Sequence, residues 1–163
     1  MTDAHLLKAR AARLATPVLE PESSQALIVF AAASGARYAA PLGRVRGVIR
    51  ESVTPVPGVA RFLAGLVNVR GNLRSVVDLN VAFGHAADEQ AIGSACVVLL
   101  ESRFGEVGVI AHDVPVLLQV RAAALQLALP GQRGVAGLVE DGGVTIALLN
   151  VDEWLGALDE GSV

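Results

Sequence analysis

Residues 38–84 read YAAPLGRVRGVIRESVTPVPGVARFLAGLVNVRGNLRSVVDLNVAFG, and this stretch decides the fold. Short Val/Ile/Leu runs alternate here with turn residues, a pattern typical of β-strands joined by tight connections. The stretch 55–58 (Pro-Val-Pro-Gly) stiffens one loop, and Arg70-Gly71 lies at a tight turn between two apolar runs. An arginine can donate several hydrogen bonds, so we expect Arg70 to hold this turn to neighbouring carbonyls or to a carboxylate such as Asp78.

The same strand character continues outward from this stretch along most of the chain. Turn residues separate ten predicted strands, near residues 25–33, 36–41, 44–50, 64–69, 73–77, 95–102, 106–111, 114–120, 135–140 and 144–149. Most gaps are too short for a crossover helix, so the sheets should be mainly antiparallel. The chain is therefore predicted to be mainly β.

An internal repeat relates the two halves of the sequence. Shifted along itself without a gap, the sequence places Gly65-Leu66-Val67 on Gly137-Leu138-Val139 and Gly71 on Gly143. Both copies read as strand, glycine turn, strand and short helix. The repeat predicts two related β-units, at about 26–84 and 95–156, that pack together and share a seam suited to binding.

Each copy is expected to end in a short helix. Asp78 and Asn150 are good N-caps for these helices, and Gly84 and Gly156 are the expected stops. Residues 5–14 show helical spacing of leucine and alanine, so residues 1–24 are predicted to be an N-terminal helix and linker. The main domain then spans residues 25–156, and residues 157–163 form a tail.

The composition bounds the classes of function. The chain has 163 residues, 53% of them hydrophobic, yet its longest apolar stretch, residues 26–33, is far shorter than the roughly 20 residues that a spanning helix needs. No direct membrane insertion is expected. A single cysteine, Cys96, excludes an internal disulfide and multi-cysteine zinc sites. The start of the chain does not read as a signal peptide, so a reducing cytoplasm fits best.

Charge is distributed unevenly along the chain. Residues 1–80 carry a net charge of +5 and residues 81–163 carry −8, which together give −3. Three explanations stay open: nucleic acid binding by the first half, head-to-tail contacts between protein molecules, or an unevenly charged solvated surface.

Catalytic groups are scarce. The three histidines show no metal-ligand spacing, no loop is suited to phosphate, and neither a metal nor a cofactor is expected. A Cys96–His112 pair would suit a small hydrolase, but Cys96 lies in an apolar run without a cation to activate it. Arg44 and Arg46 with Arg50 could form a phosphate-binding stripe, although no aromatic residues alternate with them. The chain reads as a non-enzyme, with the hydrolase and a nucleic-acid-binding β-barrel as alternatives.

Four motifs together resemble the CheW-like domain, the adaptor that couples chemoreceptors to the histidine kinase CheA. They are Pro41-Leu42 with Val45, Thr54-Pro55 with Pro57-Gly58, Gly65 with Asn68 and Arg70-Gly71, and Val77-Asp78-Leu79. The resemblance covers about residues 25–156 and implies two SH3-like five-stranded β-barrels around a hydrophobic seam. Asn68–Gly71 and Ala40–Gly43 look closer to the PilI-type adaptors of type IV pilus (twitching) systems.

The resemblance also implies partners and a binding site. The partners would be a methyl-accepting chemoreceptor tip, the CheW-like regulatory domain of a CheA-type kinase, and further copies of the chain in array rings, on the cytoplasmic side of the inner membrane. The candidates for the receptor-binding groove are Val45, Gly65, Arg70, Val114 and Leu117. Asn68, Gly71 and Asp78 belong to the structural motif.

Two residues depart from the family's pattern. Gly47 stands where an acidic residue is usual, and His112 stands where an aspartate is usual. The connection between residues 121 and 135 is also short. The choice of partner can therefore differ from that of other family members.

Overall fold

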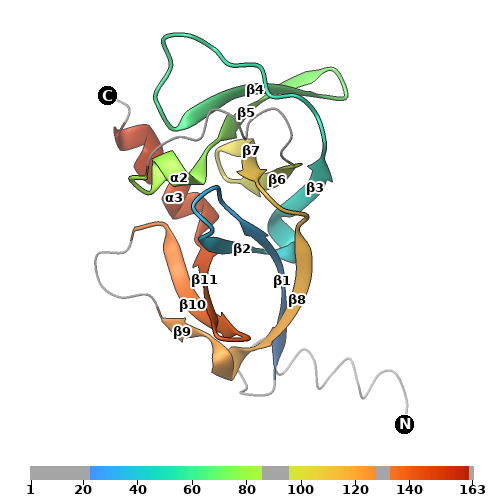
Figure 1. The fold of residues 1–163 in the computed structure, drawn as a ribbon, viewed down its shortest axis with the longest axis vertical. Coiled ribbons are helices and arrows are strands. Elements are labelled where there is room, and N and C mark those ends of the chain that lie inside the picture. The colour runs from blue at the N-terminus through green and yellow to red at the C-terminus, as the bar shows by residue number, and fades with distance from the viewer. Residues whose placement is uncertain (1–22, 86–95, 128–132, 162–163) are drawn as a thin grey trace.

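The computed structural model describes residues 23–85, 96–127 and 133–161, and it is built mainly from strands (Figure 1). The predicted helix at residues 5–14 lies outside the described residues. The strands are β1 (Ser24–Ala31), β2 (Arg37–Pro41), β3 (Val45–Ile49), β4 (Leu63–Val69), β5 (Asn72–Val77), β6 (Cys96–Ser102), β7 (Gly105–Ala111), β8 (Val116–Arg121), β9 (Gln126–Leu127), β10 (Val135–Asp141) and β11 (Val144–Leu149). Short 3₁₀ turns η1 (Leu42–Arg44) and η2 (Ala122–Ala124) and helices α2 (Leu79–Ala82) and α3 (Val151–Gly161) complete the described part.

The strands form two sheets. Sheet A has the order β8-β1-β2-β11-β10-β9, and sheet B has the order β3-β6-β7-β5-β4. All ten predicted strands are confirmed, and the two-residue strand β9 is an addition. The pairing is mainly antiparallel, as predicted, with one parallel pair in each sheet, β2 with β11 and β5 with β7.

The predicted division of the chain into units at 26–84 and 95–156 is wrong. Sheet B takes all its strands from the continuous segment 45–111, and sheet A takes its strands from the flanking segments 24–41 and 116–149. The physical reason is that β2 and β11, like β5 and β7, pair in parallel, and so each sheet joins hairpins from both halves. Sheet B is thus inserted into the sequence of sheet A.

The internal repeat nevertheless survives in the pairing of the strands. Thr54 bridges Leu66 in sheet B, and Gln126 pairs with Leu138 in sheet A, at equivalent positions of the two copies. In sheet B the chain that follows the edge strand β3 bridges the other edge strand β4, and in sheet A the chain that follows the edge strand β8 adds β9 beside β10 at the far side of the sheet. Each sheet therefore curls into a small barrel, which confirms the two SH3-like β-barrel subdomains.

Buried side chains form three clusters. One lies inside barrel A and includes Leu27 and Ile146, and another lies inside barrel B and includes Val67 and Ile110. The third is shared by the two sheets and by α3, and includes Phe30, Leu100 and Trp154. Strand β6 alternates between the inner cluster of barrel B and the shared cluster, so it is apolar on both faces. The apolar excess of the composition fills these clusters.

The helices begin as predicted, but α3 does not stop as predicted. Asp78 accepts a hydrogen bond from the Asn80 N–H, and Asn150 accepts one from the Glu153 N–H, so both act as N-caps. Helix α2 ends before Gly84, whereas α3 passes through Gly156 and continues to Gly161. Glycine lowers helix propensity without ending a helix unless it takes a left-handed conformation, which Gly84 does and Gly156 does not. The proposed tail at 157–163 is therefore largely helix.

Candidate functional site

The seam between the barrels is flanked by two edge strands, β3 and β8, which lie on the same side of the molecule in Figure 1. On β3, Val45 pairs with Leu100, a member of the shared cluster, and is itself packed against that cluster. Directly opposite residues in an antiparallel pair point to the same face. Val45 therefore faces the seam and is half-buried there.

On β8, Leu117 occupies the equivalent place. It pairs with Ile28 of β1, which packs against the same shared cluster as Val45. Because Leu117 lies on an edge strand, its side chain is 57% exposed. Val45 and Leu117 occupy matching positions of the internal repeat, so the two edge strands present related positions to one seam. We call Ile28, Val45, Val48 and Leu117 the seam surface.

Val48 is a seam residue that sequence reasoning missed. It pairs with Val98 of the shared cluster and is 44% exposed. Strict alternation from Val45 would point Val48 to the other face, but the register shifts between Val45 and Gly47. A β-bulge in the interior of a short strand leaves little signal in one sequence.

Val114 lies in the connection that leads from barrel B to β8. The preceding residue, Asp113, accepts a hydrogen bond from the Ala31 N–H at 2.8 Å and pairs with Arg37 at 3.5 Å. These contacts fix the connection against the end of β1. Val114 itself is 62% exposed, so it presents an apolar side chain beside barrel A.

The other two groove candidates lie elsewhere. Gly65 is buried at the closure of barrel B, where an added Cβ would collide with the Thr54 carbonyl oxygen. Its equivalent in barrel A, Gly137, would place a Cβ 2.6 Å from the Gln126 carbonyl oxygen. Both glycines stand at a β-bulge. Gly65 thus allows the barrel to close and offers no side chain or exposed surface to a partner.

Arg70 is exposed at the tip of the β4–β5 hairpin. Arg70 and Gly71 have φ angles of 51° and 86°, as in a type I′ turn, and Arg70 is the one non-glycine residue of the described part with positive φ. The expected contact with Asp78 is not formed, because the Asp78 carboxylate is buried as the cap of α2. The Asn68 side-chain oxygen instead closes the turn by accepting from the Gly71 N–H at 2.8 Å.

Part of the charge asymmetry is used inside the molecule. The ion pairs among the described residues join Arg37 to Asp113, Arg44 to Asp152, Arg46 to Glu101 and Arg74 to Glu106. Each pair joins an arginine of residues 1–80 to an acid of residues 81–163. Arg44 also lies in η1 and not on a strand, so the phosphate-binding stripe is not formed.

Asp152, like Asp113, is bound both by a backbone N–H and by an arginine side chain. Its carboxylate accepts from the Arg103 backbone N–H at 2.9 Å and from Arg44 at 3.1 Å. The hydrogen bond from the Arg103 backbone, and after it the charge of Arg44, lower the pKa of Asp152 below its ordinary value. The first turn of α3 is thereby tied to η1 and to the β6–β7 turn.

The described residues do not bring catalytic groups together. Cys96 is buried in the shared cluster, and no hydrogen bond joins it to His112 in the described part. Within the same ranges, no group of three His, Cys, Asp or Glu side chains could hold a metal ion. None of the described helices is long and apolar enough to cross a membrane.

Comparison with known proteins agrees with this fold. The CheW-like domain family matches residues 26–158. The chemotaxis protein CheW of Thermotoga maritima is 29% identical over 107 residues, which cover 64% of this chain and 70% of that protein. The crystal structure of the scaffolding protein TtCheW from Thermoanaerobacter tengcongensis superposes with a TM-score of 0.69 at 19% identity, over 81% of this chain and 92% of that one.

Proposed function

The chain belongs to the CheW-like domain family, and we propose that it is a non-enzymatic scaffold that couples a chemoreceptor to a CheA-type histidine kinase. Members of this family couple receptors and kinases in chemotaxis signalling. The coupling needs binding surfaces and no reacting group. The observation that carries the proposal is the exposed apolar seam surface between two barrels of related topology.

The receptor tip is proposed to dock on the seam surface. Leu117 and Val48 are more than 40% exposed, and the half-buried Val45 and Ile28 pack against the shared cluster. An amphipathic helix uses apolar anchors at helical spacing, which suits a strip of this kind. Val114 extends the strip beside barrel A, and Arg70 is proposed to contact the partner from the hairpin tip.

The kinase is proposed to dock by barrel-to-barrel contact through its own CheW-like regulatory domain. Contacts between copies of the chain in array rings are a further part of the proposal. The four internal ion pairs leave less charge for such contacts than the sequence suggested. Association of barrels should accordingly rest more on apolar surface and depend less on salt than a head-to-tail charge contact would.

The scaffold is proposed to act in the cytoplasm, at the inner membrane through its receptor. PilI-type pilus signalling is the proposed subtype. The alternatives from other classes find no support: among the described residues no hydrogen bond joins the buried Cys96 to His112, and Arg44 and Arg46 form ion pairs with acids. Iodoacetamide should therefore modify native Cys96 slowly and unfolded Cys96 fast.

The seam is tested by replacing Leu117 with glutamate. Leu117→Glu places a carboxylate where an apolar anchor would pack, so affinity for a purified receptor signalling-tip fragment should fall by about tenfold or more. Leu127→Glu is the matched control, because Leu127 is 84% exposed on β9. Titration calorimetry measures both variants, and thermal unfolding checks that they fold. Wild-type affinity in Leu117→Glu would contradict docking at the seam.

A further inference from the structure

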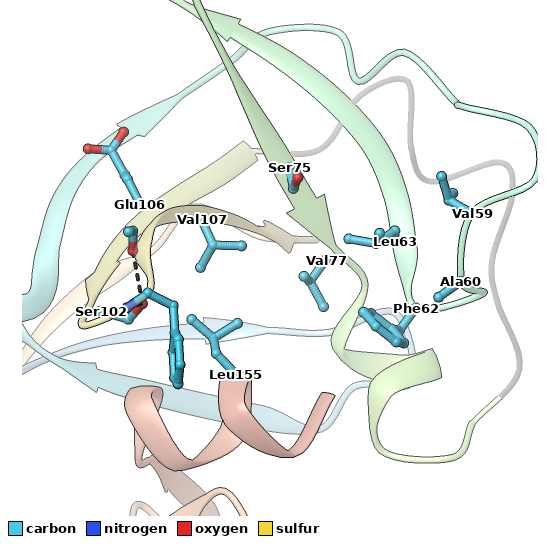
Figure 2. Close-up of a pocket in the computed structure, with 12 residues that line it drawn as sticks. Val59, Ala60, Phe62, Leu63, Ser75, Val77, Ser102, Glu106, Val107 and Leu155 are labelled. Atoms are coloured by element: carbon cyan, nitrogen blue, oxygen red, sulfur yellow. Dashed lines mark hydrogen bonds between the residues drawn. The ribbon is translucent and has the colours of Figure 1, made fainter. Parts of the chain in front are cut away.

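A second apolar surface lies on barrel B, apart from the seam surface. A cavity of about 540 Å³ opens between the β4–β5 hairpin, the β6–β7 hairpin and α3. Figure 2 shows Phe62, Leu63 and Val77 on one side of it, with Val107 and Leu155 facing them. Its lining includes none of the residues of the seam surface. The cavity belongs to the part of sheet B's outer face that α3 leaves uncovered.

Two of the polar side chains that line this cavity, Ser102 and Glu106, are already bonded within the chain. The Ser102 hydroxyl donates to the Gly105 carbonyl oxygen at 2.9 Å and accepts from the Phe104 N–H at 3.0 Å. The Glu106 carboxylate accepts from Arg74 Nε at 3.3 Å. A polar small molecule would therefore find few free partners, so apolar side chains are the better occupants.

The rim of the cavity exposes large apolar side chains to solvent. Phe104 is 56% exposed and Val59 is 41% exposed, and both line the cavity. Leu73, two residues before the lining residue Ser75 on β5, is 63% exposed. Contiguous exposed apolar side chains on a protein surface commonly mark an interaction site.

The charges beside the cavity favour an acidic occupant. Arg61 lies between the lining residues Ala60 and Phe62, and it is exposed without an ion pair to any described residue. Arg103 lies between Ser102 and Phe104, with its guanidinium 4.8 Å from the centre of the Phe104 ring. Glu106, the acid among the lining residues, is balanced by Arg74. The described surroundings thus present two arginines around an apolar floor, of which Arg103 also lies near the Asp152 carboxylate.

We propose that this cavity is a second docking surface, which binds an amphipathic helix of a partner protein with leucine or phenylalanine anchors and flanking aspartate or glutamate. The cavity lies on a face of sheet B, whereas an added strand would pair with an edge such as β3 or β4, so a helix suits this cavity better than a strand does. Apolar side chains of a helix can enter the cavity from the solvent side, while acidic side chains next to them reach Arg61 and Arg103. This surface shares no residue with the seam surface, although Val77 and Val107 on its floor belong to the shared cluster.

Synthetic peptides of defined charge test the proposal on the full chain. One peptide of about 18 residues carries leucines at helical spacing with flanking glutamates, and a second carries lysines in place of the glutamates. The acidic peptide should bind and shift the amide signals of residues 59–63 and 103–107 in an NMR titration. The basic peptide should bind about tenfold more weakly or not at all.

Variants locate the peptide on the protein. Phe104→Glu should weaken the acidic peptide about tenfold, whereas Leu127→Glu should not, and both replace residues that are more than half exposed. Arg61→Glu combined with Arg103→Glu should reverse the preference toward the basic peptide. Any of three results would overturn the proposal: no binding at about 1 mM acidic peptide, equal binding of both peptides, or binding lost in Leu117→Glu and kept in Phe104→Glu. Self-association abolished by Phe104→Glu would overturn it too, since a second copy would then fill the cavity.

Discussion

Gly65 and Gly137 show how a single residue permits a barrel to close. In each barrel the closing segment brings a backbone carbonyl to the place that a side chain would occupy. Thr54 and Gln126 supply these carbonyls from equivalent positions of the internal repeat. Closure of the barrel therefore requires a glycine at position 65, whether or not Gly65 also belongs to the binding groove that the resemblance implies.

Replacing Gly65 with alanine should destabilise the protein by at least about 2 kcal/mol or prevent folding, because backbone must move to admit the Cβ. Gly65 also has a φ of 152°, which side chains rarely adopt. Gly43→Ala is the matched control, since its Cβ would meet nothing within 4 Å. Urea unfolding measures both variants. Equal stability of the two would contradict the close approach of Thr54.

Arg70 has the backbone geometry of a glycine. Its equivalent in the other barrel is Gly142, with a φ of 58°. A left-handed conformation costs a non-glycine residue roughly 1 kcal/mol. Arg70→Gly should therefore leave stability unchanged or raise it by up to about 1 kcal/mol, while the receptor tip binds more weakly. A variant that binds as the wild type does would show that Arg70 is not a contact.

At the scale of elements, α3 depends on its first turn. Asn150 caps the helix, and Asp152 ties it to η1 and to the β6–β7 turn. An acid near a helix N-terminus also interacts favourably with the helix dipole. The short helix α2 has the cap alone, and it ends after one turn.

The stability that Asp152 contributes should depend on pH. Its pKa is lowered in the folded state, so its contribution is complete above the ordinary carboxyl pKa of 3.8 and is lost as pH falls through the folded value. Asp152→Asn should be less stable than the wild type at about pH 7, and the gap should narrow as the pH falls below 3.8. Urea unfolding across this range measures it. A constant gap would show that the Asp152 charge is not what stabilises the fold.

The elements were largely predictable because their signals are local. Alternating apolar residues and turn glycines located ten strands, and Asp78 and Asn150 located the helix starts. Strand β9 and the seam residue Val48 were not predictable. Strand β9 has two residues and is defined by its pairing with β10. The side chain of Val48 faces the seam because a β-bulge shifts the register of β3. Local sequence composition predicts neither long-range strand pairing nor a bulge.

At the scale of the whole molecule, the repeat was visible but its arrangement was not. Two related copies suggested two contiguous barrels, whereas the parallel pairs β2–β11 and β5–β7 join the halves. The opposite net charges of the two halves of the sequence fit the same arrangement. Arginines of the first half lie against acids of the second because hairpins of the two halves are neighbours.

Separating the chain between α2 and β6 should therefore leave neither half folded. A fragment of residues 1–85 keeps β1 and β2 without the strands β8 and β11 that flank them. A fragment of residues 95–163 keeps β6 and β7 without β3 and β5. Circular dichroism and urea unfolding of each fragment should show no cooperative transition. Cooperative unfolding of either fragment alone would show that its strands fold without those of the other half.

The two connections between the barrels have a mechanical consequence. The chain passes from barrel A to barrel B through η1 and returns through residues 112–115, and each passage is held by an ion pair, Arg44–Asp152 or Arg37–Asp113. Together with the buried shared cluster, these two connections restrict rotation of one barrel against the other. If a bound receptor tilts, we therefore expect the whole adaptor to rotate with it. The motion would reach the kinase without bending between the two barrels.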